Sequence, residues 1–330
     1  MNKIKNRIYS LDCSRALCML WIVGFWHLKE YCSQINVNNF IIGNVKFGVL
    51  ATFTFISGYF LGKKDFKNAE QVIDFYKKRV IRILPLLLLS CLCFLIINVS
   101  YGSSLLSQVK SCILTVLGLS CIFTPAPQTI WYISMLILFY IITPIICKSK
   151  SIPYRLIISL IVFVIFITLK HLINIDERVL IYYPFYVLGL LNIKENFIKD
   201  NFKWYVLLIS FICFLGYSFL SYYLISYDIV FINEYALSFF GVIMIIELGK
   251  LLYKAAFLCN FLTYVSYASM AAYLFHRQLF FATRLLIGDF KIWVAYLLVL
   301  PFLLIASFWL QKAYDFFIKK SSKLFINTKD

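Results

Sequence analysis

Two of the three histidines stand in apolar surroundings, where an ionisable side chain needs a partner or a purpose. His27 ends the run WIVGFWH, and because imidazole titrates near neutral pH it can act as a general base. His276 and Arg277 are adjacent within YASMAAYLFHRQLFF. We interpret His27 as the candidate catalytic base and His276 and Arg277 as candidate cavity residues. Hydrogen bonding between packed helices, or anchoring at the membrane surface, would explain the same residues without a function.

A basic segment provides the second candidate site. Residues 63–82 form the densest basic cluster and end with YKKRVIRILP. Arg79 and Arg82 are three residues apart, so they share one face of a helix. Guanidinium groups bind phosphate in a bidentate manner, which makes this pair a candidate for binding a phosphate-bearing substrate at the cytoplasmic face. Simple retention of the loop in the cytoplasm, with contact to anionic lipid, is the alternative.

Hydroxyl and aromatic side chains add weaker signals. Ser57 lies in FTFISGYFLG, where a Ser-Gly pair also permits close approach of helices. Trp131 and Tyr140 lie in TIWYISMLILFYIITP, and Tyr273 precedes His276. Aromatic residues at the start of a span are commonly interfacial, whereas the deeper hydroxyl of Tyr140 needs a partner. We count these four as further candidate cavity residues.

Several familiar motifs are missing from the sequence. It contains no nucleophile elbow, Walker loop or dinucleotide-binding glycine pattern, and no Cys/His spacing typical of a metal site. We interpret the ten cysteines as small apolar residues. We therefore expect no metal and no permanently bound cofactor.

The composition indicates where these residues must be held. Of the 330 residues, 62% are apolar and only 14% are charged, and the mean hydropathy is +0.85. One water-soluble core cannot hold this excess, so soluble, disordered and secreted disulfide-rich classes are excluded in favour of a membrane protein. The net charge of +17 is explained by basic cytoplasmic loops rather than by nucleic acid.

The hydropathy pattern predicts an all-α, polytopic integral membrane helical bundle. The predicted spans are 16–31, 47–62, 83–99, 129–147, 156–172, 179–192, 204–223, 229–248, 258–283 and 291–311. Segment 105–123 is interrupted by polar residues and is expected to be interfacial or re-entrant. About ten spans with both termini cytoplasmic place most of the 32 basic residues inside, as the positive-inside rule requires. We predict one domain over 1–330, with a basic loop at 63–82, a basic tail at 312–330 and no appended soluble domain.

Taken in order, six segments of the chain resemble motifs of the membrane acyltransferase 3 family. The segments are YSLDCSRALCMLWIVGFWH, KFGVLATFTFISGYFL, KKRVIRILP, WYISMLILFYIITP, IYYPFYVLGLL and YVSYASMAAYLFH. The resemblance implies transfer of an acyl group, often acetyl, from cytoplasmic acyl-CoA to a hydroxyl of a cell-envelope carbohydrate. It maps the family histidine onto His27, the acyl-CoA-binding pair onto Arg79 and Arg82, and the first-span arginine onto Arg15. Arg15 is therefore a further possible pocket residue.

The resemblance also implies partners and a location. The expected partners are acyl-CoA, a carbohydrate or lipid-linked glycan acceptor and membrane lipids, with no nucleic acid. The expected location is the bacterial cytoplasmic (inner) membrane. The acyl group, the acceptor sugar and the oligomeric state stay open.

Two departures from the family pattern matter. Arg15 and His27 are twelve residues apart, one more than usual, and one extra helical residue rotates a side chain by about 100°. Arg15 is therefore expected to turn away from the cavity of His27. In addition, Leu136 stands where many members carry glutamate. The chain is thus more similar to the branch that lacks this glutamate and an attached esterase-like domain.

Three other functions fit parts of the pattern. A transporter or flippase of a lipid-linked sugar or anion would use buried His and Arg along its substrate path. A glycan polymerase or ligase would change glycan length rather than ester content. A structural membrane subunit would tolerate His27→Ala.

Overall fold

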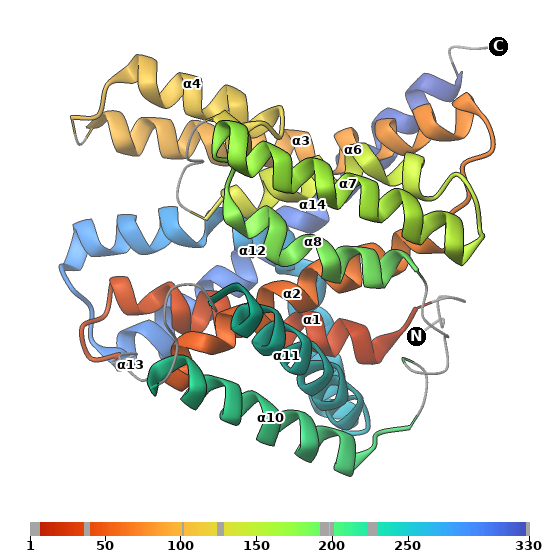
Figure 1. Cartoon of the computed structure of the whole chain (residues 1–330). Helices are drawn as coiled ribbons and strands as arrows, with labels where there is room; N and C mark the ends of the chain where they lie inside the picture. Colours follow the sequence, from red (N-terminus) through yellow and green to blue (C-terminus); the bar gives the residue numbers. More distant parts are fainter. Residues whose placement is uncertain are drawn as a thin grey trace.

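The computed structural model describes residues 7–35, 40–100, 102–123, 129–191, 198, 201–223 and 230–327. No strand occurs among them. The helices, drawn in Figure 1, are α1 (Tyr9–Trp21), α2 (Phe40–Gly62), α3 (Ala69–Ser100), α4 (Leu105–Val116), α5 (Ser120–Phe123), α6 (Trp131–Ile146), α7 (Ile152–Ile173), α8 (Glu177–Leu190), α10 (Trp204–Tyr223), α11 (Val230–Tyr253), α12 (Ala256–Ile287), α13 (Ile292–Val294) and α14 (Leu300–Asn327).

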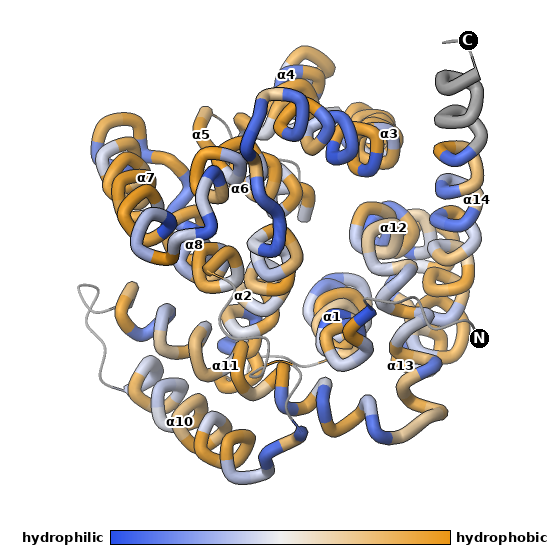
Figure 2. The backbone as a smooth tube through the Cα atoms, turned by 90° about the vertical axis from the view of Figure 1, so that its right-hand side faces the viewer, coloured by the Kyte–Doolittle hydropathy of each residue, from blue (hydrophilic) through white to orange (hydrophobic). Residues whose placement is uncertain are grey.

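The prediction of an all-helical, multi-pass membrane protein is confirmed for the described residues. Six helical segments are long and apolar enough to cross a membrane: α2, α3, α7, α10, residues Phe231–Tyr253 of α11 and Ile292–Lys319. The apolar helices α4 and α6 are shorter. Figure 2 shows that apolar residues predominate along most of these helices. Many of the apolar side chains of α3, α7 and α10 are exposed, where they can contact lipid. The predicted span 16–31 overlaps the second half of α1 and the turns that follow it, and the spans 179–192 and 258–283 overlap α8 and α12. None of these three is among the six candidate membrane spans, so ten crossings remain a prediction.

The segment 105–123 is broken, but not at the polar residues that suggested an interruption. Gln108 lies inside α4 and accepts a hydrogen bond from Asn98 of α3 at 2.9 Å. The break comes at Gly118, whose φ of +74° is a conformation that glycine adopts without steric cost. At 12 residues, α4 is about 18 Å long, which is too short to cross the hydrocarbon core.

Glycines allow the central helices to approach closely. A Cβ atom on Gly48 of α2 would lie 2.7 Å from the Cα of Gly241 in α11, which a real side chain cannot do. Gly58 of α2 faces the backbone of α8 in the same way. Gly58 therefore has the packing role that the Ser-Gly pair permits, and α2 packs between α8 and α11.

A local irregularity in the first helix takes up the extra residue between Arg15 and His27. Residues Ile22–Trp26 form a π-helical turn, and the amide of His27 bonds to the carbonyl of Ile22 at 2.9 Å. Because this bond spans five residues instead of four, one additional residue is absorbed without the 100° rotation expected for a regular helix. The rotation inferred from the spacing is thus wrong, for this physical reason.

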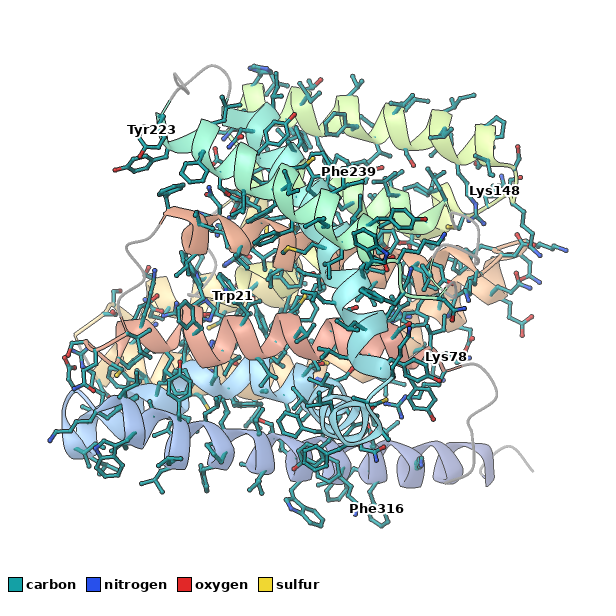
Figure 3. The ribbon with its side chains drawn as sticks, turned by 90° about the horizontal axis from the view of Figure 1, so that it is seen from below. Trp21, Lys78, Lys148, Tyr223, Phe239 and Phe316 are labelled. Atoms are coloured by element: carbon teal, nitrogen blue, oxygen red, sulfur yellow. The ribbon has the colours of Figure 1, made fainter. Side chains whose placement is uncertain are left out.

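The two ends of the bundle differ in character. Lys78 and Lys148 lie at one end and Tyr223 at the other, as Figure 3 shows. The first turn of α1 lies at the end with the lysines, and α14 runs toward that end (Figure 1). We refer to it as the basic end. The described chain thus begins and finishes on one side, as the predicted topology requires.

Candidate functional site

The centre of the candidate site is a pair of histidines from α12 and the end of the first helix. His27 Nδ1 lies 2.7 Å from His276 Nε2, and the two rings are nearly parallel, with an interplanar angle of 9° and centroids 4.9 Å apart. His276 is fully buried, whereas His27 is partly exposed. The structure thus joins two residues that are 249 positions apart in the chain.

The hydrogen bonds of His276 fix the proton positions of both rings. His276 Nδ1 lies 2.8 Å from the carbonyl of Tyr273 and 3.1 Å from that of Ala272, and it must donate because both are acceptors. In the neutral ring, Nε2 is then an acceptor, so His27 donates to it from Nδ1. This leaves Nε2 of neutral His27 with a free lone pair, which is what a general base needs.

His27 forms part of the wall of a cavity of about 460 Å³ at the end of the bundle opposite the basic end. The cavity is lined by the ends of helices that are distant in the sequence. Candidate residues in its wall are Trp131, Tyr273 and Arg277. We call it the outer cavity.

Neighbouring polar contacts hold the wall of the outer cavity in place. Arg277 donates to both carboxylate oxygens of Glu30, at 2.6 and 2.9 Å. The hydroxyl of Tyr273 donates to the carbonyl of Thr129 at 2.5 Å. The guanidinium of Arg178 lies over the ring of Trp131, 3.8 Å from the ring centroid. These groups therefore have structural partners in addition to any contact with substrate.

A second group of candidate residues lies nearer the basic end. The guanidinium of Arg79 is 5.2 Å from the ring centroid of Tyr140, and the hydroxyls of Tyr140 and Ser57 are 2.8 Å apart. The Tyr140 hydroxyl thus has the partner that its depth demands. Arg79 also lies 5.5 Å from the ring of Phe75.

Lys64 completes this basic cluster, although it was not a sequence candidate. Its ammonium is 5.2 Å from the Phe75 ring, and burial together with the charges of Arg79 and Lys78 lowers the pKa of Lys64. Cations crowded in this way favour an anion between them.

Arg15 belongs to the basic side and does not line the outer cavity. It lies 3.7 Å from Asp12 and within electrostatic range of Arg82 and Tyr140. About twelve helical residues, or roughly 18 Å, separate it from His27. The expectation that Arg15 stays away from His27's cavity agrees with this placement, but the cause is distance along the helix rather than rotation.

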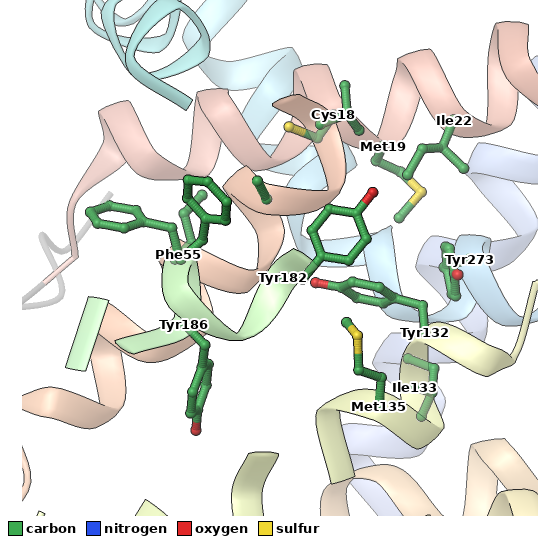
Figure 4. Close-up of a cluster of buried hydrophobic side chains, with 14 of the residues drawn as sticks. Cys18, Met19, Ile22, Phe55, Tyr132, Ile133, Met135, Tyr182, Tyr186 and Tyr273 are labelled. Atoms are coloured by element: carbon green, nitrogen blue, oxygen red, sulfur yellow. The ribbon is translucent and has the colours of Figure 1, made fainter. Parts of the chain in front are cut away.

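An apolar cluster separates the outer cavity from the basic side. Figure 4 shows Cys18 and Met19 of α1 near Tyr132 and Tyr182. Tyr132 is buried, and its hydroxyl lies 3.3 Å from that of Thr54. Packed side chains of α1, α2, α6 and α8 therefore lie between the outer cavity and the basic cluster around Arg79.

Several wall residues of the outer cavity were not sequence candidates: Lys46, Glu177, Arg178 and Glu234. Each stands near the beginning of a helix, where a charge is ordinarily explained by the membrane surface. Only the packing of α2, α8 and α11 shows that they face one space. The sequence signal that could have identified them is a charged residue within or beside an apolar segment.

The fold and the site define a multi-pass helical membrane protein with a hydrogen-bonded histidine pair at the wall of a cavity. Residues 8–311 match the family model of the acyltransferase 3 domain. The chain therefore belongs to the acyltransferase 3 family, as its motifs suggested. No curated protein and no solved structure matches it.

Proposed function

We propose that this protein is an O-acyltransferase of the bacterial cytoplasmic membrane. It moves an acyl group, which we take to be acetyl, from cytoplasmic acyl-CoA to a hydroxyl of a cell-envelope carbohydrate. The observation that carries the proposal is the His27–His276 pair, with an unprotonated Nε2 on His27, at the wall of a cavity opposite the basic end.

The donor is assigned to the basic side. The phosphates of acyl-CoA bind Arg79 and Arg82, with Lys64 beside them, because guanidinium and ammonium groups form charge-assisted hydrogen bonds with phosphate. The positive-inside rule supports a cytoplasmic position for this end, with ten spans and both termini inside. The acyl arm must then pass the apolar cluster between the two groups.

The chemistry is assigned to His27. Its Nε2 takes the proton of the acceptor hydroxyl as the hydroxyl oxygen attacks the thioester carbonyl carbon. The carbon–sulfur bond then breaks, and the CoA thiolate leaves with a proton from His27. The products are the O-acyl carbohydrate and CoA. His276 positions His27 and keeps its proton on Nδ1.

The test uses the ester content of the cell-envelope glycan. We compare a deletion strain, the deletion carrying wild type and the deletion carrying His27→Ala at equal membrane levels. We expect base-labile O-acyl groups to be lost in the deletion, regained with wild type and absent with His27→Ala. Equal ester in all three strains would refute acylation of that glycan. Sugar movement that does not depend on acyl-CoA would favour a transporter.

A further inference from the structure

Two opposite charges line the outer cavity without forming an ion pair. Lys46 comes from α2 and Glu234 from α11, and both side chains are half-buried in the cavity wall. They lie within electrostatic range of each other. Among the described residues, neither has an ion-pair partner within 4.0 Å.

The other cations of the wall are already compensated. Arg178 is paired with Asp176, and Arg277 is paired with Glu30 at 2.6 Å. Glu177, at the exposed rim, lies within electrostatic range of Glu234. A second ammonium, that of Lys29, lies 3.6 Å over the ring of Trp26 in the wall and within electrostatic range of Lys46. The carboxylates of Glu177 and Glu234 thus balance these two ammoniums, and an acidic ligand would gain no net attraction from the wall.

A half-buried charged group costs free energy unless a ligand or water forms hydrogen bonds with it. A carboxylate accepts hydrogen bonds and an ammonium donates them. A molecule that satisfies both at once must carry donors and acceptors close together, as neighbouring sugar hydroxyls do. Trp131 and Tyr182 add aromatic surface to the same wall.

We propose that Lys46 and Glu234 form an acceptor subsite that selects an uncharged carbohydrate over an acidic one. Glu234 accepts a hydrogen bond from one hydroxyl of the acceptor, and Lys46 donates to a neighbouring oxygen. The subsite holds the acceptor so that a further hydroxyl meets His27. This inference rests on the proposed function and names the substrate class of the same site.

The test uses full-length protein in proteoliposomes, with acetyl-CoA as donor. The acceptors are methyl β-glucoside, which is uncharged, and methyl β-glucuronide, which differs by one carboxylate. We measure acceptor-dependent release of CoA for wild type, Lys46→Met and Glu234→Gln. The controls are Lys291→Met and Asp289→Asn, which remove charges at the same end outside the cavity wall.

We expect wild type to use the glucoside with a kcat/KM about tenfold or more above that of the glucuronide. The glucuronide has a carboxylate in place of a hydroxyl that can donate to Glu234, so it loses one charge-assisted hydrogen bond. Lys46→Met should lower kcat/KM for the glucoside by about tenfold through the acceptor KM. Glu234→Gln should reduce the preference for the glucoside. The KM for acetyl-CoA should stay as in wild type in both variants. The two control variants should keep the wild-type kcat/KM for both acceptors. A general structural defect would change these values.

A wild-type preference for the glucuronide would overturn the subsite. So would a ratio of kcat/KM for glucoside over glucuronide that is the same in both variants as in wild type. The ester content of the envelope glycan is a second measurement, for which both variants should lose ester and both controls should keep it. Ester equal to wild type in both variants would also overturn the subsite. Failure of the proposed function would give a different result. The strain carrying wild type and the deletion strain would then have the same ester content.

Discussion

Replacing His276 by leucine removes the acceptor that His27 Nδ1 has among the described residues, while leaving His27 itself in place. The bond of 2.7 Å is lost, and its donor is left without a partner. An unsatisfied buried donor costs about 1–3 kcal/mol, which corresponds to roughly 5- to 150-fold in an equilibrium. The ring of His27 can avoid this cost by moving its proton to Nε2, and that tautomer cannot accept a proton at Nε2, the atom assigned to the acceptor hydroxyl.

We therefore expect His276→Leu to lower kcat by about 100-fold. This is within the 10²–10⁴-fold that general-base catalysis typically supplies, so His27→Ala should be at least as severe. The KM for acetyl-CoA should not change, because Arg79 and Lys64 lie toward the opposite end. Single-turnover transfer of labelled acetyl groups in proteoliposomes measures kcat without interference from product release.

The matched variant is His276→Gln, whose amide oxygen can reach the position of Nε2 and accept from His27. It should recover much of the activity lost in the leucine variant. Activity of His276→Leu within twofold of wild type would refute the tautomer argument. Equal loss in the leucine and glutamine variants would show that His276 acts only through packing.

Further predictions concern the basic end and the mechanism. Arg79→Gln should raise the KM for acetyl-CoA by about tenfold, measured by CoA release, and an unchanged KM would contradict its role. Since burial and the charges of Arg79 and Lys78 lower the pKa of Lys64, its cation is present below that pKa and lost above it. Affinity for CoA should therefore begin to fall with rising pH below the ordinary lysine range, and Lys64→Gln should flatten this dependence in a binding titration. Arg155→Leu should lower stability in detergent by about 3 kcal/mol, because buried Arg155 donates to the last carbonyls of α2 and α8 at 2.8 and 2.6 Å; thermal unfolding like wild type would contradict this. Direct transfer predicts no acetyl label on the protein without acceptor, and retained label would favour an acyl-enzyme relay.

The sequence predicted the parts of this structure that depend on local pattern. The apolar runs specify helices because only helices satisfy the backbone inside a bilayer. His27 was recognisable because an imidazole at the end of such a run is costly without a use, and the pair Arg79 and Arg82 because basic residues three apart share a helix face.

The rest depended on contacts that the sequence does not encode locally. The partner of His27 is 249 residues away, and no spacing rule links them. Lys46 and Glu234 look like interfacial charges until α2 and α11 pack together. The π turn before His27 and the left-handed Gly118 are backbone choices between nearly equal local states, which tertiary packing decides.

The central claim is that an acyl group passes from the basic end to a base at the opposite end. The most direct measurement uses sealed proteoliposomes with one protein orientation, labelled acetyl-CoA on the side of the basic end and the acceptor glycan only on the other. The account predicts labelled ester on the glycan with wild type and none with His27→Ala. Transfer that requires donor and acceptor on the same side, or that persists in His27→Ala, would contradict it.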